Sequence, residues 1–472
     1  MLLVFYLALC LLALVQVVLM VIHAVEHRRY HRVRFAHPPG REASPYTSLF
    51  VPCKGWDIEL DRNLRSLFCQ NYPVIDDAPN DATTNGATTA YEICLIVESV
   101  DEPCVVVFEQ LRREYPRQAA RVVLAGVAEG RGQKVHNLQQ ATRTLPDRTE
   151  VLAFVDADAR PHPMWLRRMV DRIASGKQAV CTGYRWQVPV RPTTVNLVLA
   201  ASNNWLATLT SSHGLNLIWG GAWAITRRKF AELGFPDAWG GALSDDLVAS
   251  RILRDAGERI AYEPWSLIAS PVDSNWLEFV GFLRRQYVVA AVCVPKWWWS
   301  GLLATSLSLS MLVLSAVVAV DLARSGSSWW WGPLAAGLTY YLANVARVFS
   351  GIRAVAPFLE EKPSGTPRML ALMTWGWPLI SAVHLTGLLI GQFGRTLLWR
   401  GIRYRLRSPL ETEILGRTTY PEPILPPSPR ATSSTPHGLG EVAGDGQRSG
   451  QHRMTDQINA DRAVGHPPRG GL

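Results

Sequence analysis

Two carboxylates stand directly after a short apolar run in the middle of the chain. Val151–Val155 is followed by Asp156 and, two positions later, by Asp158. Alternate residues of a strand point the same way, so a strand ending here would present both side chains together. Such carboxylates can hold a hard divalent cation, Mn²⁺ or Mg²⁺. The alternative is a solvated acidic turn, because Asp-X-Asp patterns often occur by chance.

A second acidic cluster, Ser244-Asp245-Asp246, opens a helix-like stretch that runs to Gly257. Acidic residues in a first helical turn favour the helix dipole, so capping alone could explain them. The functional interpretation makes one of the two carboxylates a general base that takes the proton of an attacking hydroxyl. Adjacent carboxylates can also push each other's proton affinities apart.

Basic side chains occur at two places that suit a departing diphosphate. Lys134 follows the glycine-rich turn Gly130–Gly132, although a single loop lysine is more often just solvated. Arg284 and Arg285, followed by Gln286, stand where the central part of the chain meets the later apolar runs. The two arginines could clamp a diphosphate, or could extend along an apolar surface to the membrane interface.

The elements that must position these residues alternate between strands and helices. Apolar, β-like runs occur at 48–51, 93–97, 122–125 and 151–155, with helix-like stretches at 57–70, 105–115 and 163–174. This alternation predicts an α/β domain over residues 46–275, with a mainly parallel sheet covered on both faces. Ligands of such sheets bind outside the carboxyl ends of the strands. Residues 76–90, poor in large apolar side chains, predict an inserted surface loop.

Long apolar runs flank this domain. Residues 1–22 carry no charge and are long enough to cross a bilayer. The sequence lacks the basic n-region and the small-residue cleavage site of a signal peptide. These features predict an uncleaved anchor over residues 1–25. The strongly basic stretch 27–34 that follows predicts that the α/β domain lies in the cytoplasm.

Three further apolar runs, 299–320, 329–349 and 369–393, predict membrane helices within residues 299–395. Residues 276–298 predict an amphipathic segment on the membrane surface. One anchor and three spans would put the C-terminus outside, yet an arginine-rich stretch after residue 394 favours the inside. Either one run is re-entrant, since Pro378 lies inside the last, or the charge rule fails. Residues 411–472, dominated by Pro, Gly, Ser and Thr, predict a disordered tail.

The composition argues against other classes of protein. The formal net charge is +9, but much of the Lys and Arg lies beside the apolar runs, with no nucleic-acid-binding motif. The seven cysteines include no Cys-X-X-Cys pair, so neither a disulfide framework nor a zinc site is indicated. We expect an integral, multi-pass protein of the cell membrane with no nucleic acid partner.

Taken together, these segments resemble family 2 and family 21 glycosyltransferases, and most closely the ceramide glucosyltransferase group. The similarity spans residues 48–286 and the membrane segments on both sides. The matching phrases are Pro52-Cys53-Lys54-Gly55, Gln70-Asn71-Tyr72-Pro73, Tyr91-Glu92, Glu102-Pro103, Tyr115-Pro116, Lys134-Val135-His136-Asn137-Leu138, Asp156 and Ser244-Asp245-Asp246. Their order and spacing fit with one gap, at the inserted loop. The resemblance implies substrate contacts at Pro52, Lys54 and Lys134.

The resemblance implies a GT-A fold, with a Rossmann-like sheet, and an inverting transfer. The donor would be a UDP-sugar, often UDP-glucose, and the acceptor a membrane lipid such as ceramide or diacylglycerol. The second acidic position of the family falls on Asp156, a donor contact, and the presence of Asp158 strengthens a metal site. The third falls on Asp246, which would be the base, with Asp245 as its acidic neighbour.

Two family positions differ here. The first acidic position falls on Ser99, so Glu98 or Asp101 would take over the nucleotide contact. In the closing motif Arg285 keeps its family place, but Gln286 replaces a tryptophan. This departure counts against strict ceramide specificity and suggests a relative of bacterial type.

Two other functions remain open. A processive polysaccharide synthase would need more membrane spans and an intact Gln-X-X-Arg-Trp motif, both of which are missing. A catalytically inactive membrane scaffold would explain Ser99 and Gln286, but Asp156, Asp158 and Asp246 argue against it. The sequence thus predicts a membrane-bound glycosyltransferase that uses a UDP-sugar, a lipid acceptor and a divalent cation.

Overall fold

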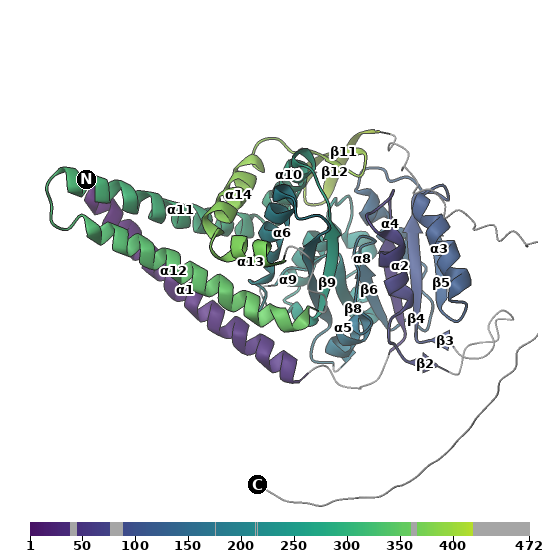
Figure 1. The fold of residues 1–472 in the computed structure, drawn as a ribbon. Helices are drawn as coiled ribbons and strands as arrows, with labels where there is room; N and C mark the ends of the chain where they lie inside the picture. Colours follow the sequence, from purple (N-terminus) through teal and green to yellow (C-terminus); the bar gives the residue numbers. More distant parts are fainter. Residues whose placement is uncertain are drawn as a thin grey trace, which may run out of the picture. The chain divides into compact units, whose positions relative to one another are not determined.

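A seven-stranded sheet forms the centre of the computed structural model, which describes residues 1–37, 45–75, 88–174, 176–212, 214, 216–359 and 366–418. Its order is β5-β4-β1-β6-β8-β7-β9 (Figure 1). The strands are β1 (Thr47–Pro52), β4 (Tyr91–Val97), β5 (Ala119–Leu124), β6 (Val151–Val155), β7 (Val180–Pro189), β8 (Ala222–Thr226) and β9 (Ala261–Val272). β8 is antiparallel to β6 and β7, and the other pairs are parallel. The predicted mainly parallel sheet is confirmed.

Helices cover both faces of this sheet. On β1, Leu49 and Val51 point to one face and Phe50 to the other, as alternation in a strand requires. The first face packs against α2 (Leu60–Phe68), α3 (Pro103–Glu114) and α5 (Trp165–Ala174). The second packs against α4 (Gln133–Thr142), α7 (Arg227–Glu232), α8 (Phe235–Ala238) and α9 (Asp245–Asp255). Both faces are therefore buried, as predicted for a sheet of this kind.

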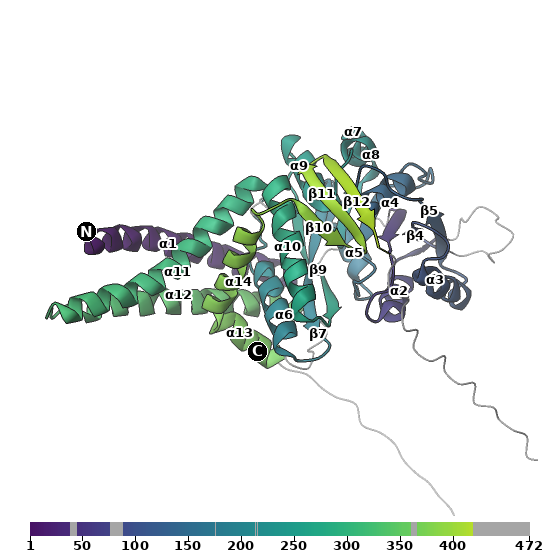
Figure 2. The same ribbon diagram turned by 90° about the horizontal axis from the view of Figure 1, so that it is seen from above.

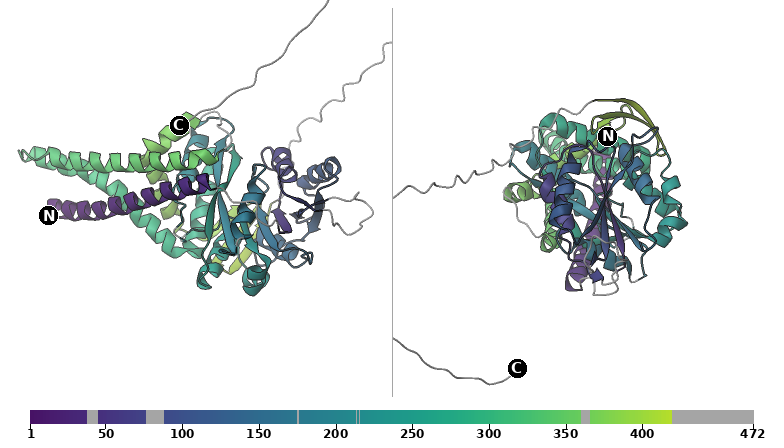
Figure 3. Two further views of the ribbon diagram at one scale, coloured as in Figure 1. Left: turned by 90° about the horizontal axis from the view of Figure 1, so that it is seen from below. Right: turned by 90° about the vertical axis from the view of Figure 1, so that its right-hand side faces the viewer.

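Three long helices, α1 (Leu2–Ala36), α11 (Pro295–Arg324) and α12 (Trp331–Val355), pack against one another beside the sheet domain (Figures 2 and 3). α1 and α11 are long and apolar enough to cross a membrane. α6 (Thr194–Ala207) and α10 (Trp276–Cys293) lie between these helices and the sheet. The short 3₁₀ turn η1 (Ala356–Phe358) follows α12.

The last predicted membrane run is broken. Its residues form α13 (Thr366–Thr374) and α14 (Trp377–Ile390), which meet at a bend of 78°. Pro378 lies in the first turn of α14, where its missing N–H costs no helical hydrogen bond. The break agrees with the possibility that this run does not cross the membrane as one straight helix.

A second, antiparallel sheet follows α14. It contains β10 (Thr396–Trp399), β11 (Ile402–Ser408) and β12 (Glu411–Arg417). The prediction of a disordered tail from residue 411 was wrong for Glu411–Arg417, because these residues pair with β11, whose apolar side chains are buried against the α/β domain. Residues 419–472 of the predicted tail lie outside the described residues.

The predicted inserted loop begins and ends in a small hairpin. β2 (Val74–Ile75) pairs with β3 (Thr88–Thr89) in antiparallel register. Residues 76–87 of that loop lie outside the described residues. The hairpin holds the two ends of the insertion together next to β4.

Candidate active site

Lys134 joins the two acidic clusters. Its Nζ lies 2.7 Å from Asp156 Oδ1 and 3.1 Å from Asp245 Oδ1. Asp156 directly follows β6, Asp245 opens α9, and Lys134 lies in the first turn of α4. The structure thus brings together two clusters that the sequence presents separately.

The turn before α4 explains this approach. Gly130 has a φ of +64°, a left-handed conformation that favours glycine. The N–H of Gly132 donates to the carbonyl of Ala242 at 2.9 Å, and a Cβ on Gly132 would lie 2.7 Å from the carbonyl oxygen of Leu243. Only a residue without a side chain fits there, so the start of α4 packs directly against the segment that precedes Asp245.

Burial sets the charges of this pair. Asp245 is 2% exposed, and burial raises its pKa to about 7 although Lys134 opposes the shift. Burial alone would lower the pKa of Lys134, but Asp156, Asp245 and Asp246 together raise it above its usual value. Lys134 therefore remains a cation, whereas Asp245 titrates near neutral pH.

Asp246 is oriented by three hydrogen bonds. Its Oδ2 accepts from the N–H of Gly220 at 3.1 Å, and its Oδ1 accepts from the N–H of Leu247 at 2.7 Å and from the Ser244 hydroxyl. Ser244 also caps α9, because its hydroxyl accepts from the N–H of Leu247. The Leu247 N–H is thus shared by Ser244 and Asp246, and Asp246 also lines the cavity described below.

Gly220 completes the cluster. A Cβ at this position would lie 2.8 Å from Lys134 Nζ and 2.9 Å from Asp245 Oδ2. A side chain here would push the ion pair apart. The Trp219-Gly220-Gly221 segment carries no motif that sequence analysis could have recognised.

Of the two carboxylates after β6, Asp158 is the one whose negative charge is poorly compensated. Burial, Asp156 and Asp57 raise the pKa of Asp158 to about 6, against Arg185 and Arg400. Its Oδ1 is buried and has no hydrogen-bond partner within the described ranges. A buried carboxylate oxygen without a partner is a position that a cation would stabilise.

Asp156 and Asp158 fit a divalent cation that is also bound by substrate. In the part of the chain that the structure describes, no three His, Cys, Asp or Glu side chains form a metal-binding group. Two carboxylates are nevertheless sufficient for Mg²⁺-type sites in which phosphate oxygens and water supply the other ligands. The residues present therefore fit a cation whose remaining ligands are supplied by a bound diphosphate and water.

Three arginines face the same region from different elements: Arg185 on β7, Arg285 on α10, and Arg400 in the β10–β11 turn. Burial lowers the pKa of Arg285 to about 10, and the other two arginines add to this effect. The Arg285 guanidinium lies over the ring of Trp399, 5.2 Å from its centre. Three cations near two carboxylates can bind a polyanion such as a diphosphate.

The other predicted arginine, Arg284, points elsewhere. Its guanidinium donates to the carbonyls of Phe393 at 3.0 Å and of Thr396 at 3.2 Å, and so fixes the entry to β10. Gln286, which replaces the family tryptophan, lines the cavity with Arg285. Of the predicted arginine pair, the structure thus brings only Arg285 to the acidic residues.

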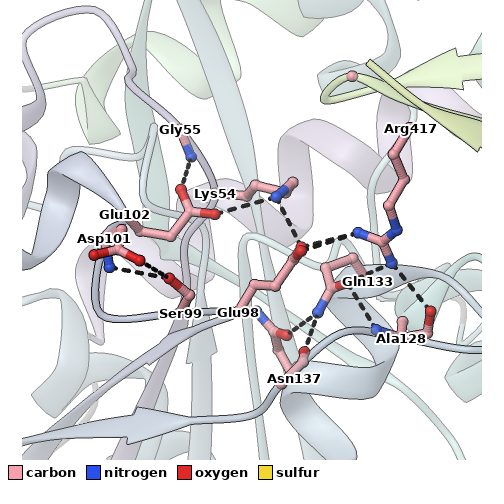
Figure 4. Close-up of polar contacts among 12 residues, drawn as sticks. Lys54, Gly55, Glu98, Ser99, Asp101, Glu102, Ala128, Gln133, Asn137 and Arg417 are labelled. Carbon is pink, nitrogen blue, oxygen red and sulfur yellow. Dashed lines mark hydrogen bonds and ion pairs between the residues drawn. The ribbon is translucent and has the colours of Figure 1, made fainter. Parts of the chain in front are cut away.

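The residues predicted to contact the nucleotide form a second polar group (Figure 4). Lys54 Nζ lies 2.7 Å from Glu98 and 3.1 Å from Glu102. Arg417 of β12 binds Glu98 at 3.1 Å, so that this carboxylate lies between two cations. Asp101 is exposed, and its N–H donates to the Ser99 hydroxyl at 3.0 Å.

One cavity of about 1070 Å³ connects the acidic residues with the long helices. Pro52, Lys54 and all the predicted aspartates except Asp101 line its polar end. Glu98 and Arg284 are not among the described residues that line it. Its other end lies among the long helices and carries both apolar side chains, such as Leu19, Met20 and Leu388, and polar ones, such as Gln16, Asn344 and Ser381.

The mainly parallel seven-stranded sheet with helices on both faces is the architecture that was predicted for a glycosyltransferase of the GT-A fold. The family model for glycosyl transferase family 21 matches residues 8–411. The chain therefore belongs to glycosyl transferase family 21, and it is a glycosyltransferase.

Two solved structures are similar to this chain. One is the mannosyltransferase PcManGT from Pyrobaculum calidifontis in complex with GDP-Man and Mn²⁺, which is 16% identical. That similarity covers 82% of this chain and 99% of the other, with a TM-score of 0.42. The second is a mycobacterial protein, 17% identical over 52% of this chain and 74% of the other, with a TM-score of 0.30.

Proposed function

We propose that this glycosyltransferase inverts the anomeric centre as it transfers a sugar, with glucose as the first candidate, from a UDP-sugar to a membrane lipid such as ceramide or diacylglycerol. One observation carries the proposal. A single cavity is lined by Asp246 and by residues of the helices α1, α11, α12 and α14 beside the sheet domain, Leu19, Met20 and Leu388 among them. A lipid alcohol entering between these helices would reach the acidic residues without leaving the protein.

Asp246 is the proposed base. The acceptor hydroxyl gives its proton to this carboxylate while its oxygen attacks C1 of the sugar. The bond between C1 and the diphosphate oxygen breaks, and UDP departs with the electron pair. The hydrogen bonds from Gly220 and Leu247 hold Asp246 in one orientation, whereas Asp245 is engaged with Lys134. A single displacement of this kind inverts the anomeric centre.

The donor would be held by the cations around Asp156. Lys134, Arg185, Arg285 and Arg400 are the proposed contacts for the diphosphate. Asp156 and Asp158 would hold Mn²⁺ or Mg²⁺, which when bound neutralises the charge that develops on the leaving diphosphate. These groups concentrate positive charge where the transfer releases an anion.

The nucleotide would lie at the carboxyl ends of β1 and β4. Pro52 and Lys54 follow β1 and line the cavity. Glu98 is fixed by Lys54 and Arg417 and remains our candidate for the contact that an aspartate at Ser99 would make in relatives. Asp101 is the weaker candidate, because its side chain is exposed and turned to Ser99.

The contacts of the C-terminal sheet bear on membrane topology. Tyr404 accepts a hydrogen bond from the N–H of Gln133, and Arg417 binds Glu98, so β10–β12 lie on the same side as the α/β domain. We propose that α11 leaves that side, α12 returns to it, and the bent pair α13–α14 does not cross. From the basic stretch 27–34 we further propose that the α/β domain faces the cytoplasm and that the N-terminus lies outside.

A donor and acceptor screen tests this function. Protein in neutral detergent is incubated with Mn²⁺, a membrane lipid extract and one UDP-sugar at a time. Lipid products are then identified by mass spectrometry. We expect one hexose added to a lipid. A polymer in the membrane fraction would favour a polysaccharide synthase, and failure to bind or hydrolyse any UDP-sugar would favour an inactive scaffold.

A further inference from the structure

A buried arginine lies at the membrane end of the cavity. Arg347, on α12, is 7% exposed and lines the cavity. Its guanidinium lies over the ring of Trp205, 4.7 Å from the ring centre. Trp205 belongs to α6, at the junction between the α/β domain and the long helices. Gly351, one turn further along α12, packs against Thr208 just after α6, which fixes the two helices together there.

Two hydrogen-bond donors at this junction have no acceptor. Arg347 Nε and Trp205 Nε1 are both buried, and neither has a hydrogen-bond partner among the residues that the structure describes. Both side chains line the cavity, but Nε and Nε1 are themselves covered, so a ligand would contact the Arg347 guanidinium through its two Nη atoms. A buried donor without an acceptor costs about 1–3 kcal/mol, and more when it is charged.

Among the residues that the structure describes, none supplies a counter-charge for Arg347. α6, α12 and α14 contain no Asp or Glu at all. Glu26, on the adjoining α1, accepts from the Ser212 hydroxyl and lies 3.8 Å from Arg29. Within the described ranges no ion pair involves Arg347. Ionisable groups at membrane depth are expensive and usually face a partner or a substrate path, so the missing anion points to a ligand.

We propose that Arg347, positioned by the ring of Trp205, binds the phosphate of an anionic lipid, and that this lipid is the acceptor. The second half of the proposal rests on the proposed function, and it replaces the neutral acceptors named there, ceramide and diacylglycerol, by a phospholipid with a free hydroxyl. A guanidinium binds phosphate oxygens through parallel hydrogen bonds. The apolar walls formed by Leu19, Leu388 and Gly301 suit an acyl chain. The phosphate would then anchor the lipid while its free hydroxyl reaches Asp246.

The lipid is a better occupant than a free phosphate or the donor. The donor end of the cavity has its own cations, Lys134, Arg185, Arg285 and Arg400, on other elements. Arg347 is instead surrounded by the long helices and by α6. Leu19, Met20 and Leu388 in the same lining favour an anion that carries an acyl chain over a free phosphate.

Lipid binding is measured first, without any sugar donor. Protein in neutral detergent is titrated with phosphatidic acid and with diacylglycerol of the same acyl chains, and bound lipid is counted by native mass spectrometry. We expect phosphatidic acid to bind at least about tenfold more tightly. Arg347→Gln should abolish that preference, Arg347→Lys should keep part of it, and Arg353→Gln, an exposed arginine of the same helix, should leave it unchanged.

Equal binding of the two lipids by the unaltered protein would overturn the proposal, and that comparison needs no variant to fold. Displacement of phosphatidic acid by inorganic phosphate at equal concentration would also overturn it, because the site would then recognise a free anion. An unchanged preference in Arg347→Gln would assign the phosphate to other residues.

Transfer is measured second, with phosphatidylglycerol and diacylglycerol as competing acceptors and UDP-glucose as donor. We expect the sugar mainly on phosphatidylglycerol. Equal or preferred transfer to diacylglycerol would refute the acceptor assignment but leave the transferase function intact. Donor hydrolysis and transfer that are both absent, with lipid binding preserved, would instead reject the proposed function.

Discussion

Replacement of Asp158 by asparagine should stabilise the metal-free protein above pH 6. Burial, Asp156 and Asp57 raise the pKa of Asp158 from 3.8 to about 6. A carboxyl group with a raised pKa in the folded chain stabilises the protein at low pH, and that contribution is lost as the pH rises through about 6. Two pKa units correspond to about 3 kcal/mol. Because the side chain is only partly buried, we expect about 1–2 kcal/mol after solvent screening.

The assay is thermal unfolding between pH 4.5 and 8 in neutral detergent with EDTA. The gap between the two proteins should be smallest at pH 4.5, widen up to about pH 6 and stay constant above it, with Asp158→Asn melting at the higher temperature. Asp101→Asn, at an exposed carboxylate, is the matched control and should show no such separation. Mn²⁺ with UDP-sugar should then raise the melting temperature of the unaltered protein more than that of Asp158→Asn. A variant that is less stable at pH 8, or a gap that does not depend on pH, would refute the reasoning.

Three further outcomes follow from the site. Lys134→Met removes the cation shared by two aspartates and should lower turnover on the order of 10²-fold, measured as product formed at saturating donor. Gly220→Ala places a methyl group 2.8 Å from Lys134 Nζ; it should weaken binding of a fluorescent UDP analogue, and unchanged affinity would contradict the close packing. Arg400→Gln should weaken UDP binding about tenfold in calorimetry, whereas Arg403→Gln, exposed on β11, should not.

The strand that carries Asp156 and Asp158 could be predicted because its signal is local. A continuous apolar run that ends in two carboxylates identifies a buried strand and its end without any knowledge of the rest of the fold. Ser244 likewise marked the start of α9. The role of Lys134 could not be predicted in the same way. Its position between Asp156 and Asp245 depends on how α4, β6 and α9 pack, and no spacing in the sequence encodes that contact.

The C-terminal sheet was missed for a different reason. The arginines after residue 394 suggest charges that flank a membrane helix, and on that interpretation β11 is not predicted. Ile402, Tyr404 and Leu406 are buried while the arginines between them are exposed, a period-two pattern typical of a half-buried strand. Recognition of that pattern would have predicted β11. It would not have shown that the β10–β11 turn carries Arg400 into the cavity.

The most direct test of the account compares the unaltered protein with Asp246→Asn. Donor affinity is measured with a fluorescent UDP-sugar analogue, and transfer to lipid is measured as mass-resolved product per minute. If Asp246 removes the acceptor's proton, donor affinity should change by no more than about twofold, while turnover should fall on the order of 10²–10⁴-fold. Turnover equal to that of the unaltered protein would contradict the assignment of Asp246 as the base.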